Sequence, residues 1–329
     1  MQTTKEIVAR IQRGQAGYHL LALLTIAVWG TTFISTKVLL RSGLSPADIM
    51  LCRFALAYVC ICLCSRPLRW RADSWRDEGL CLLSGLTGAS LYFITENTAL
   101  QHTLVANVSL IVCACPLLTL LGQCLLAERR WPGRWLCLGT LLALVGVAVV
   151  ILRGQFVLRL NPLGDLLCLG TALSWTAYTF INRRLLRRYP SLFVVRKTFV
   201  YGLLTLAPFI LLQGGAFRAG LGVLFRWSVL GQLLFLGLVA SFLCFLWWNV
   251  CLRHVDTVLL NNYIYLGPIV SILTAHIVLG EGIGPAVVLG TVLVIAGMVM
   301  AGQKRSAGGP RHANSRTGSN REAEHHLSK

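Results

Sequence analysis

An internal repeat constrains this chain more than any other feature of its sequence. Seven landmarks of one largely apolar stretch recur in the same order, 151 to 153 positions later. The pairs are Gly85 and Gly237, Asn97 and Asn249, His102 and His254, Pro116 and Pro268, Glu128 and Glu281, Gly139 and Gly290, and Gly146 and Gly297. Solenoid repeats have periods of about 20–50 residues. A repeat of this length therefore has the size of one half of a membrane protein that arose by duplication.

The repeat extends toward the N-terminus at slightly shorter spacings. Four further pairs are separated by 144 or 146 positions: Trp29 and Trp175, Lys37 and Arg183, Pro46 and Pro190, and Arg53 and Lys197. We therefore expect a first repeat over residues 18–153 and a second over 162–302. Residues 1–17 precede the first repeat, and the polar residues 303–329 have the composition of a disordered tail.

The composition favours a membrane protein. Hydrophobic residues make up 56% of the 329 residues and charged residues only 13%, whereas a soluble globular chain has about 25% charged residues. The net charge of +18 comes from short basic clusters between apolar runs, without a nucleic-acid-binding signature, so no nucleic-acid partner is expected. Most of the twelve cysteines lie in apolar segments, where a free cysteine behaves as a small hydrophobe.

Ten stretches are long and apolar enough to cross a bilayer, which takes about 20 residues per helix. They are residues 18–40, 47–64, 80–100, 104–126, 133–152, 162–182, 192–212, 228–251, 257–279 and 285–302. The first apolar run lacks a small-residue cleavage site, so we expect a retained helix rather than a signal peptide. The sequence thus predicts an all-α membrane protein with ten transmembrane helices, five in each repeat.

The basic residues predict the orientation. Of the 30 Lys and Arg residues, 21 fall on the side of the N-terminus, five on the opposite side and four inside predicted helices. By the positive-inside rule both termini are cytoplasmic. Because each repeat has an odd number of helices, the second repeat enters the membrane upside down. The sequence therefore predicts two inverted five-helix repeats.

Ionisable residues inside a bilayer are costly and are functional candidates. Lys37 and Glu96 fall at a similar depth in the outer half of the bilayer, where they could pair, bind the two ends of a zwitterion, or extend to the outer surface. Arg53 and Lys197 lie deeper in their helices. They are candidates for an anion site or for charge coupling, and the alternative is packing at helix interfaces.

Aromatic and amide side chains gather on the same helices, and such a set suits a small organic solute. The candidate solute-binding residues are Trp29, Lys37, Glu96, Asn97, Asn107, Trp175, Trp248, Asn249, Asn262 and Tyr263. Each could instead make an ordinary contact between helices. Pro116 and Pro268 lie in mid-helix and are expected to kink cavity walls or flexing elements, whereas Glu128 and Glu281 are expected to be structural. The glycines at 139, 146, 290 and 297 let helices approach closely, within the bundle or in a dimer.

At this point the residues carry a resemblance. The runs WGTTFISTKVLLRSGLSPADIMLCRFALA and ENTALQHTLVANVSLIVCACPLLTLLGQCLLAE, with NYIYLGPIVSILTAHIVLGE and LGTVLVIAGMVMAG in the second half, resemble the EamA repeat of the drug/metabolite transporter superfamily. The resemblance covers about residues 20–302. It implies a ten-helix carrier of the plasma or bacterial inner membrane, with the fifth and tenth helices set apart from a central cavity. Members typically export amino acids, other metabolites or drugs, often in exchange for protons.

The function expected from these observations is alternating-access transport of a small organic solute, with the lipid bilayer and possible coupling protons as partners, and with a homodimer left open. No cofactor or metal is expected. Two other classes of function are the alternatives. A membrane-embedded enzyme or lipid-modifying protein is disfavoured because no HExxH, GxSxG or paired-aspartate motif occurs, and a scaffold or sensor because no soluble domain is appended.

Overall fold

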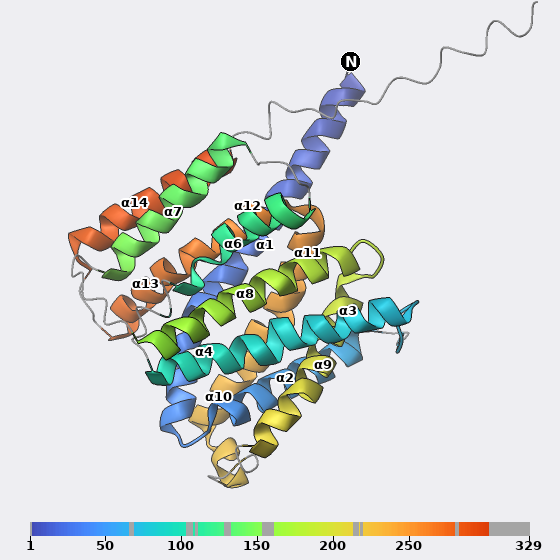
Figure 1. Ribbon diagram of the computed structural model, residues 1–329, viewed down its shortest axis with the longest axis vertical. Coiled ribbons are helices and arrows are strands. Elements are labelled where there is room, and N and C mark those ends of the chain that lie inside the picture. Colours follow the sequence, from blue (N-terminus) through green and yellow to red (C-terminus); the bar gives the residue numbers. More distant parts are fainter. Residues whose placement is uncertain are drawn as a thin grey trace, which may run out of the picture.

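The computed structural model describes residues 2–65, 69–102, 108, 111–127, 133–152, 161–212, 217, 220–279 and 283–302. Within these ranges the chain is helical and contains no β-strand, which confirms the predicted all-α class. The helices form one bundle (Figure 1). The predicted tail at 303–329, and the candidates Asn107, Glu128 and Glu281, lie outside the described residues.

The first repeat contains four long helical segments and one shorter one. In chain order they are α1 (Gln2–Arg41), α2 (Pro46–Cys64), the continuous run α3 (Trp75–Gly85), η1 (Leu86–Ser90) and α4 (Leu91–His102), then α6 (Cys115–Gly122) with η2 (Gln123–Ala127), and α7 (Arg134–Leu152). Helix α1 is longer than predicted, since it begins at Gln2, and its first turns project beyond the other helices (Figure 1).

The second repeat has the same succession. It consists of α8 (Pro162–Leu185), α9 (Ser191–Leu212), a short η3 (Leu221–Phe225), the run α10 (Trp227–Leu234), η4 (Phe235–Leu243) and α11 (Cys244–His254), then α12 (Thr257–Asn262), η5 (Tyr263–Leu266) and α13 (Gly267–Leu279), and α14 (Pro285–Gly302). The π-helical segment η1 begins directly after Gly85, and η4 contains the equivalent Gly237, so the backbone irregularity is repeated at a similar place.

Eight helices in the described ranges are long and apolar enough to cross a membrane, and Cys115–Leu125 forms a shorter apolar helix. Helix α8, with 24 residues, is long enough but is not among the eight. The exact number of ten spans therefore stays a prediction. Exposed tryptophans mark the ends of the bundle, as is typical of the membrane interface: Trp75 is 85% exposed and Trp227 is 88% exposed.

Local sequence explains where several helices begin. Ser45 and Asp48 form a capping box ahead of α2, with Pro46 at the first helical position, and Asn161 caps α8 through the backbone N–H of Gly164 at 3.0 Å. These residues satisfy backbone donors that the helix itself leaves free. Pro116 and Pro268 lie in the first turns of α6 and α13 rather than in mid-helix as predicted. A turn at Cys113–Ala114 precedes Pro116, and the 3-10 segment η5 precedes Pro268, so each proline follows a break in the helix, where its missing N–H is tolerated.

Helices α7 and α14 pack against each other along one edge of the bundle (Figure 1). A Cβ atom added at Gly139 would lie 2.5 Å from the carbonyl oxygen of Gly297, and one added at Gly146 would lie 2.8 Å from that of Gly290. The predicted glycine face therefore brings two backbones together within one chain. A homodimer stays a prediction, and this face is already occupied.

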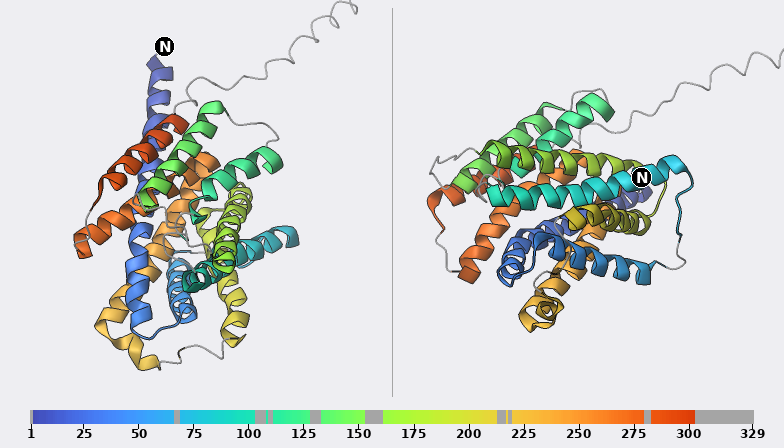
Figure 2. Two further views of the ribbon diagram at one scale, coloured as in Figure 1. Left: turned by 60° about the vertical axis from the view of Figure 1, so that its left-hand side comes forward. Right: turned by 60° about the horizontal axis from the view of Figure 1, so that its bottom comes forward.

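Two equivalent contacts between the repeats lie at opposite ends of the bundle, as inverted repeats require. The first turns of α3 and α9 contact each other at one end, where Lys197 binds Glu78. The first turns of α2 and α10, their counterparts in the repeat, contribute to one apolar cluster at the other end. We name these the inner end and the outer end, because the arginine distribution predicts the first to be cytoplasmic. The main hydrophobic core extends from Tyr189 and Phe193 at the inner end to Trp175 and Phe245. Figure 2 shows the helix bundle from two further directions.

Candidate functional site

Three tryptophans from both repeats meet in the middle of the bundle. Trp29 of α1 and Trp175 of α8 lie edge to face, with ring centroids 5.5 Å apart. Trp248 of α11 completes the group, at 5.3 Å from Trp29 and 5.8 Å from Trp175. Because Trp29 and Trp175 are repeat counterparts, this tryptophan cluster sits where the two halves of the chain join.

The three indole nitrogens differ in their hydrogen bonding. Trp29 Nε1 donates to the carbonyl oxygen of Ala240 at 2.9 Å, and Trp175 Nε1 donates to Oδ1 of Asn261 at 3.1 Å. Trp248 is fully buried, yet its Nε1 has no hydrogen-bond partner among the described residues. A buried donor without an acceptor is costly and rare, which sets this indole apart from the other two of the cluster.

Two buried ionisable side chains, Arg53 and Glu96, adjoin the tryptophan cluster. Arg53 Nε donates to Ser241 Oγ at 2.9 Å, and its guanidinium lies 4.6 Å from the centroid of the Phe93 ring. Glu96 accepts from the Tyr92 hydroxyl at 3.1 Å and lies within electrostatic range of Arg53, without a direct salt bridge between the two. Both side chains are below 10% exposed. Tyr92 in turn packs against Trp175, with centroids 5.5 Å apart, so the charges and the aromatic rings form one continuous site.

A polar network flanks the cluster on the side of the inner end. Asn249 donates to the Tyr178 hydroxyl and receives a bond from Asn182, both at 2.8 Å. Asn182 also accepts from the Ser84 hydroxyl at 2.6 Å. Tyr178 lies 5.1 Å from Trp175 between ring centroids. By contrast, the hydrogen bond of the repeat counterpart Asn97 within the described part of the chain is a long contact of 3.8 Å to the Met50 sulfur.

The structure thus brings together Trp29, Trp175, Trp248, Glu96 and Arg53, with Asn249 joined to them through Tyr178. The remaining candidates lie elsewhere. Asn262 bonds with Thr140 of α7, and the Tyr263 hydroxyl lies 2.8 Å from His19 Nδ1. Of Lys37 only the backbone in α1 is described, so its predicted pairing with Glu96 stays a hypothesis.

Several residues of this site were not predicted from the sequence. Tyr92, Asn182 and Ser241 each contact a predicted residue, as described above. The repeat could have indicated that Glu96 and Trp248 lie at the same site, because they occupy equivalent positions 152 residues apart. The two repeats therefore contribute a carboxylate and an indole from matching places.

The outer end contains a hollow beyond the tryptophan cluster. A cavity of about 330 Å³ is lined by residues of α1, α10, η4 and α13: Thr31, Ile34, Ser35, Gly231, Gln232, Phe235 and Thr274. Its lining begins two residues beyond Trp29 in α1, which is about 3 Å along a helix. The hollow therefore approaches the tryptophan cluster from the outer end.

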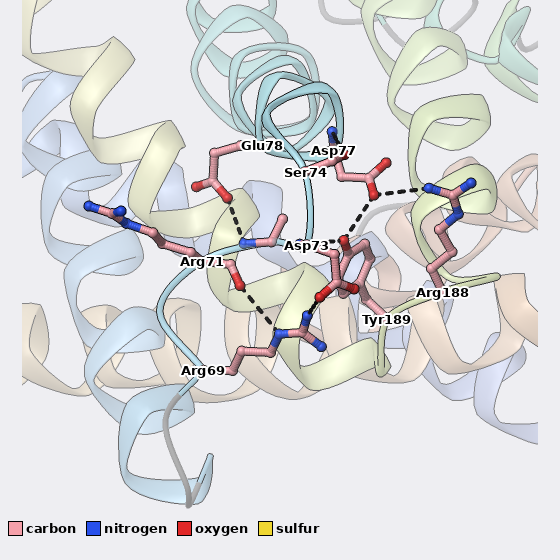
Figure 3. Close-up of polar contacts among 9 residues, drawn as sticks. Arg69, Arg71, Asp73, Ser74, Asp77, Glu78, Arg188 and Tyr189 are labelled. Atoms are coloured by element: carbon pink, nitrogen blue, oxygen red, sulfur yellow. Dashed lines mark hydrogen bonds and ion pairs between the residues drawn. The ribbon is translucent and has the colours of Figure 1, made fainter.

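The inner end is closed by hydrogen bonds and ion pairs between the repeats (Figure 3). Asp77 accepts from Arg188 at 3.1 Å and from the Tyr189 hydroxyl at 2.9 Å. Burial raises the pKa of Tyr189, and the Asp77 carboxylate adds to the effect, so the tyrosine remains a donor. The neighbouring Glu78 accepts from Lys197 and Tyr201 of α9.

Comparison with known proteins identifies the family of this chain. The model of the EamA-like transporter family matches residues 17–152 and again residues 162–303. The chain belongs to the EamA-like transporter family. Both halves match it separately, in agreement with the internal repeat.

Relatives across bacteria carry transport names. A probable terminal-alkyne amino-acid exporter of Streptantibioticus cattleyicolor is 27% identical over 294 residues, which cover 89% of this chain and 95% of that protein. A probable amino-acid metabolite efflux pump of Salmonella typhimurium is 28% identical over 288 residues, covering 84% and 92%. A solved crystal structure at 20% identity superimposes with a TM-score of 0.72 over 88% of this chain and 98% of its own. The chain is therefore a membrane transporter of small molecules.

Proposed function

We propose that this EamA-family member is a secondary carrier that exports an amino acid or a closely related metabolite by alternating access. The observation that carries the proposal is the central site, where the tryptophan cluster adjoins the buried side chains of Arg53 and Glu96. Aromatic walls with a few placed polar groups are the usual composition of a small-molecule site. Its position at the junction of two inverted repeats is typical of secondary transporters.

The chemistry of the site favours a small solute with both charged and apolar parts. Arg53 suits a carboxylate, Glu96 suits an ammonium group, and the tryptophan cluster suits an apolar side chain. The unpartnered Trp248 N–H adds one donor for a solute oxygen. A free amino acid carries all of these groups, and two relatives are named for the export of amino acids or their metabolites.

Alternating access requires that the two ends open in turn. The inner end is closed by ion pairs, and the outer end has a hollow that approaches the tryptophan cluster. This asymmetry supports a carrier closed toward the side predicted to be cytoplasmic. In the proposed cycle one repeat tilts against the other, so that the site faces each side once. Glu96 is the group proposed to carry the coupling proton.

Counterflow in proteoliposomes tests the proposal. Vesicles loaded with unlabelled amino acid should accumulate the labelled compound chemically unchanged. An enzyme would alter the compound, and a scaffold would accumulate none. The same assay with Glu96→Gln should show a changed pH dependence of flux between pH 5 and 8. Flux that is independent of pH in both proteins would remove Glu96 from the mechanism while leaving transport intact.

A further inference from the structure

The first turn of α3 is bound to α9 through the partly buried carboxylate of Glu78. Glu78 accepts hydrogen bonds from Lys197 Nζ, from the Tyr201 hydroxyl and, at 2.9 Å, from the backbone N–H of Ala72. The side chains of Lys197 and Glu78 are 8% and 18% exposed. Three donors thus converge on one carboxylate, and two of them come from the opposite repeat.

The adjacent ion pair is of a different kind. Arg188 also crosses to the first repeat, where it binds Asp77. The Asp77 side chain is 7% exposed but that of Arg188 is 68% exposed, so water competes for the charge of the arginine and weakens the pair. Both side chains of the Glu78–Lys197 pair are largely shielded, at 18% and 8% exposed, so removing one partner of this pair is more costly. Glu78 and Lys197 therefore dominate the contact.

Two helical turns beyond Glu78, α3 and α9 make a second, closer contact at Gly85 and Gly202. A Cβ atom added at Gly85 would lie 2.7 Å from the backbone nitrogen of Gly202, and one added at Gly202 would lie 2.7 Å from Cβ of Ala89. Glu78 precedes Gly85 by seven residues, about 10 Å along a helix. Since the backbones already touch at Gly85 and Gly202, the first turns of α3 and α9 can separate by pivoting about that point.

We infer that Glu78 and Lys197 form a latch between the repeats, which holds the inner end closed and must break before the site can face that side. The inference rests on the proposed alternating access and adds the contact that controls it. When the helices separate, water enters and solvates both charges. The ion pair therefore stabilises the closed state, and water replaces it in the open state. A contact that differs in this way between two states shifts the equilibrium between them.

A native cysteine reports whether the latch is closed. Cys81 lies one turn after Glu78 in α3 and is fully buried. Its modification by N-ethylmaleimide, measured in nanodiscs by peptide mass mapping, should be slow in the natural protein. In Lys197→Met it should be at least about ten-fold faster, because local opening governs access to a buried group. Arg188→Gln, which breaks only the more exposed pair, should change the rate less than about two-fold.

Two controls separate opening from unfolding. Cys168 of α8 is also fully buried but belongs to a separate small cluster with Ala99 and Val108, so it should stay unmodified in every folded variant. The double variant Glu78→Leu/Lys197→Met replaces the ion pair with apolar side chains, which commonly preserves a buried contact. It should fold and protect Cys81 again.

The outcomes are decisive. An unchanged Cys81 rate in Lys197→Met overturns the latch. If Lys197→Met exposes Cys168 as well, that variant has unfolded, and the double variant provides the test. Protection of Cys81 in the double variant supports the latch. Rapid modification of Cys81 in the double variant, with Cys168 unmodified, overturns it. The labelling needs no solute. Absent counterflow with the expected labelling pattern would therefore contradict the transport proposal and leave the latch standing.

Discussion

The contact of α3 with α9 at the inner end and the contact of α2 with α10 at the outer end come from equivalent segments of the two repeats. The inner contact holds the largely shielded ion pair of Glu78 and Lys197. The outer contact belongs to an apolar cluster that includes Leu44, Ile49, Val229 and Leu233. A polar link at the same end joins Asp48 Oδ1 to the backbone N–H of Phe217, which lies between α9 and η3 in the sequence, at 2.6 Å.

The difference shows how a duplicated scaffold acquires two unlike ends. Position 230, the counterpart of Glu78, is a leucine. Arg53, the counterpart of Lys197, therefore has no carboxylate there and instead binds Ser241 near the centre. The same basic position of the repeat thus has two roles. Lys197 in the second repeat makes a contact at the inner end, and Arg53 in the first repeat lies at the central site. The repeat conserves the backbone path, and single substitutions set the chemistry at each end.

The largest expected effect tests the close helix contacts at the two ends. A Cβ atom at Gly85 would meet the backbone of Tyr201 and Gly202 within 2.8 Å, whereas one at Gly237 would first meet the side chain of Leu56 at 2.7 Å. Backbone yields less than a side chain. Gly85→Ala should therefore destabilise the protein by about 3 kcal/mol and Gly237→Ala by about 1–2 kcal/mol. Thermal unfolding in detergent measures both, and equal losses would contradict the asymmetry.

The next effect concerns the paired asparagines of the two repeats. Asn249→Leu removes a side chain that bonds Asn182, Tyr178 and the carbonyl of Phe245, each at 2.8 Å. It should cost about 2–3 kcal/mol, because buried partners lose their bonds. Asn97→Leu loses the weak sulfur contact and should cost less than about 1 kcal/mol. Denaturation of the two variants side by side gives the comparison, and a larger loss for Asn97 would refute it.

A smaller effect is expected at the outer polar link. Asp48→Ala removes the acceptor for Phe217 and half of the capping box at the start of α2. It should cost about 1–2 kcal/mol. Asp48→Asn keeps an acceptor and should cost less. The loss should appear in the melting temperature without increased modification of Cys81, because the change lies at the end opposite the latch.

The smallest effect separates two tryptophans at the centre. Trp175→Phe removes an indole that binds Asn261, whereas Trp248→Phe removes one whose N–H has no described partner. Trp175→Phe should therefore be the more destabilising by about 1 kcal/mol. Trp248→Phe should weaken solute binding about five-fold, the equivalent of one hydrogen bond. Thermal shifts with and without solute measure both quantities, and unchanged binding in Trp248→Phe would leave its N–H without a role.

Much of the fold follows from the sequence because hydrophobicity and helix length are local properties. The predicted helix ends at residues 133–152, 162 and 285–302 differ from those of α7, α8 and α14 by one residue at most. The glycines at 139, 146, 290 and 297 were expected to permit a close approach, within the bundle or in a dimer, and the structure shows that they meet between α7 and α14. The π-helical segments η1 and η4 could not be predicted, since an apolar run of this kind is compatible with either helix type.

The candidate site was harder to predict than the fold. Glu96, Arg53 and the tryptophans stand out as polar or bulky residues inside apolar runs, and they lie together in the structure. Their partners depend on packing between distant segments: Lys197 binds a carboxylate 119 residues away, and Trp29 binds a carbonyl 211 residues away. No local pattern encodes such pairs. For the same reason Asn262 and Tyr263, which look similar in sequence, contact Thr140 and His19 instead.

The glycine contact between α7 and α14 has a consequence for biosynthesis. Gly139 and Gly146 meet Gly297 and Gly290, which are encoded 158 and 144 residues later. At translation speeds of about 5–20 residues per second, this interval lasts about 7–32 s. During that time the groove on α7 must be covered by lipid or by the insertion machinery. Assembly of the first repeat can therefore be completed only when the last helix leaves the ribosome.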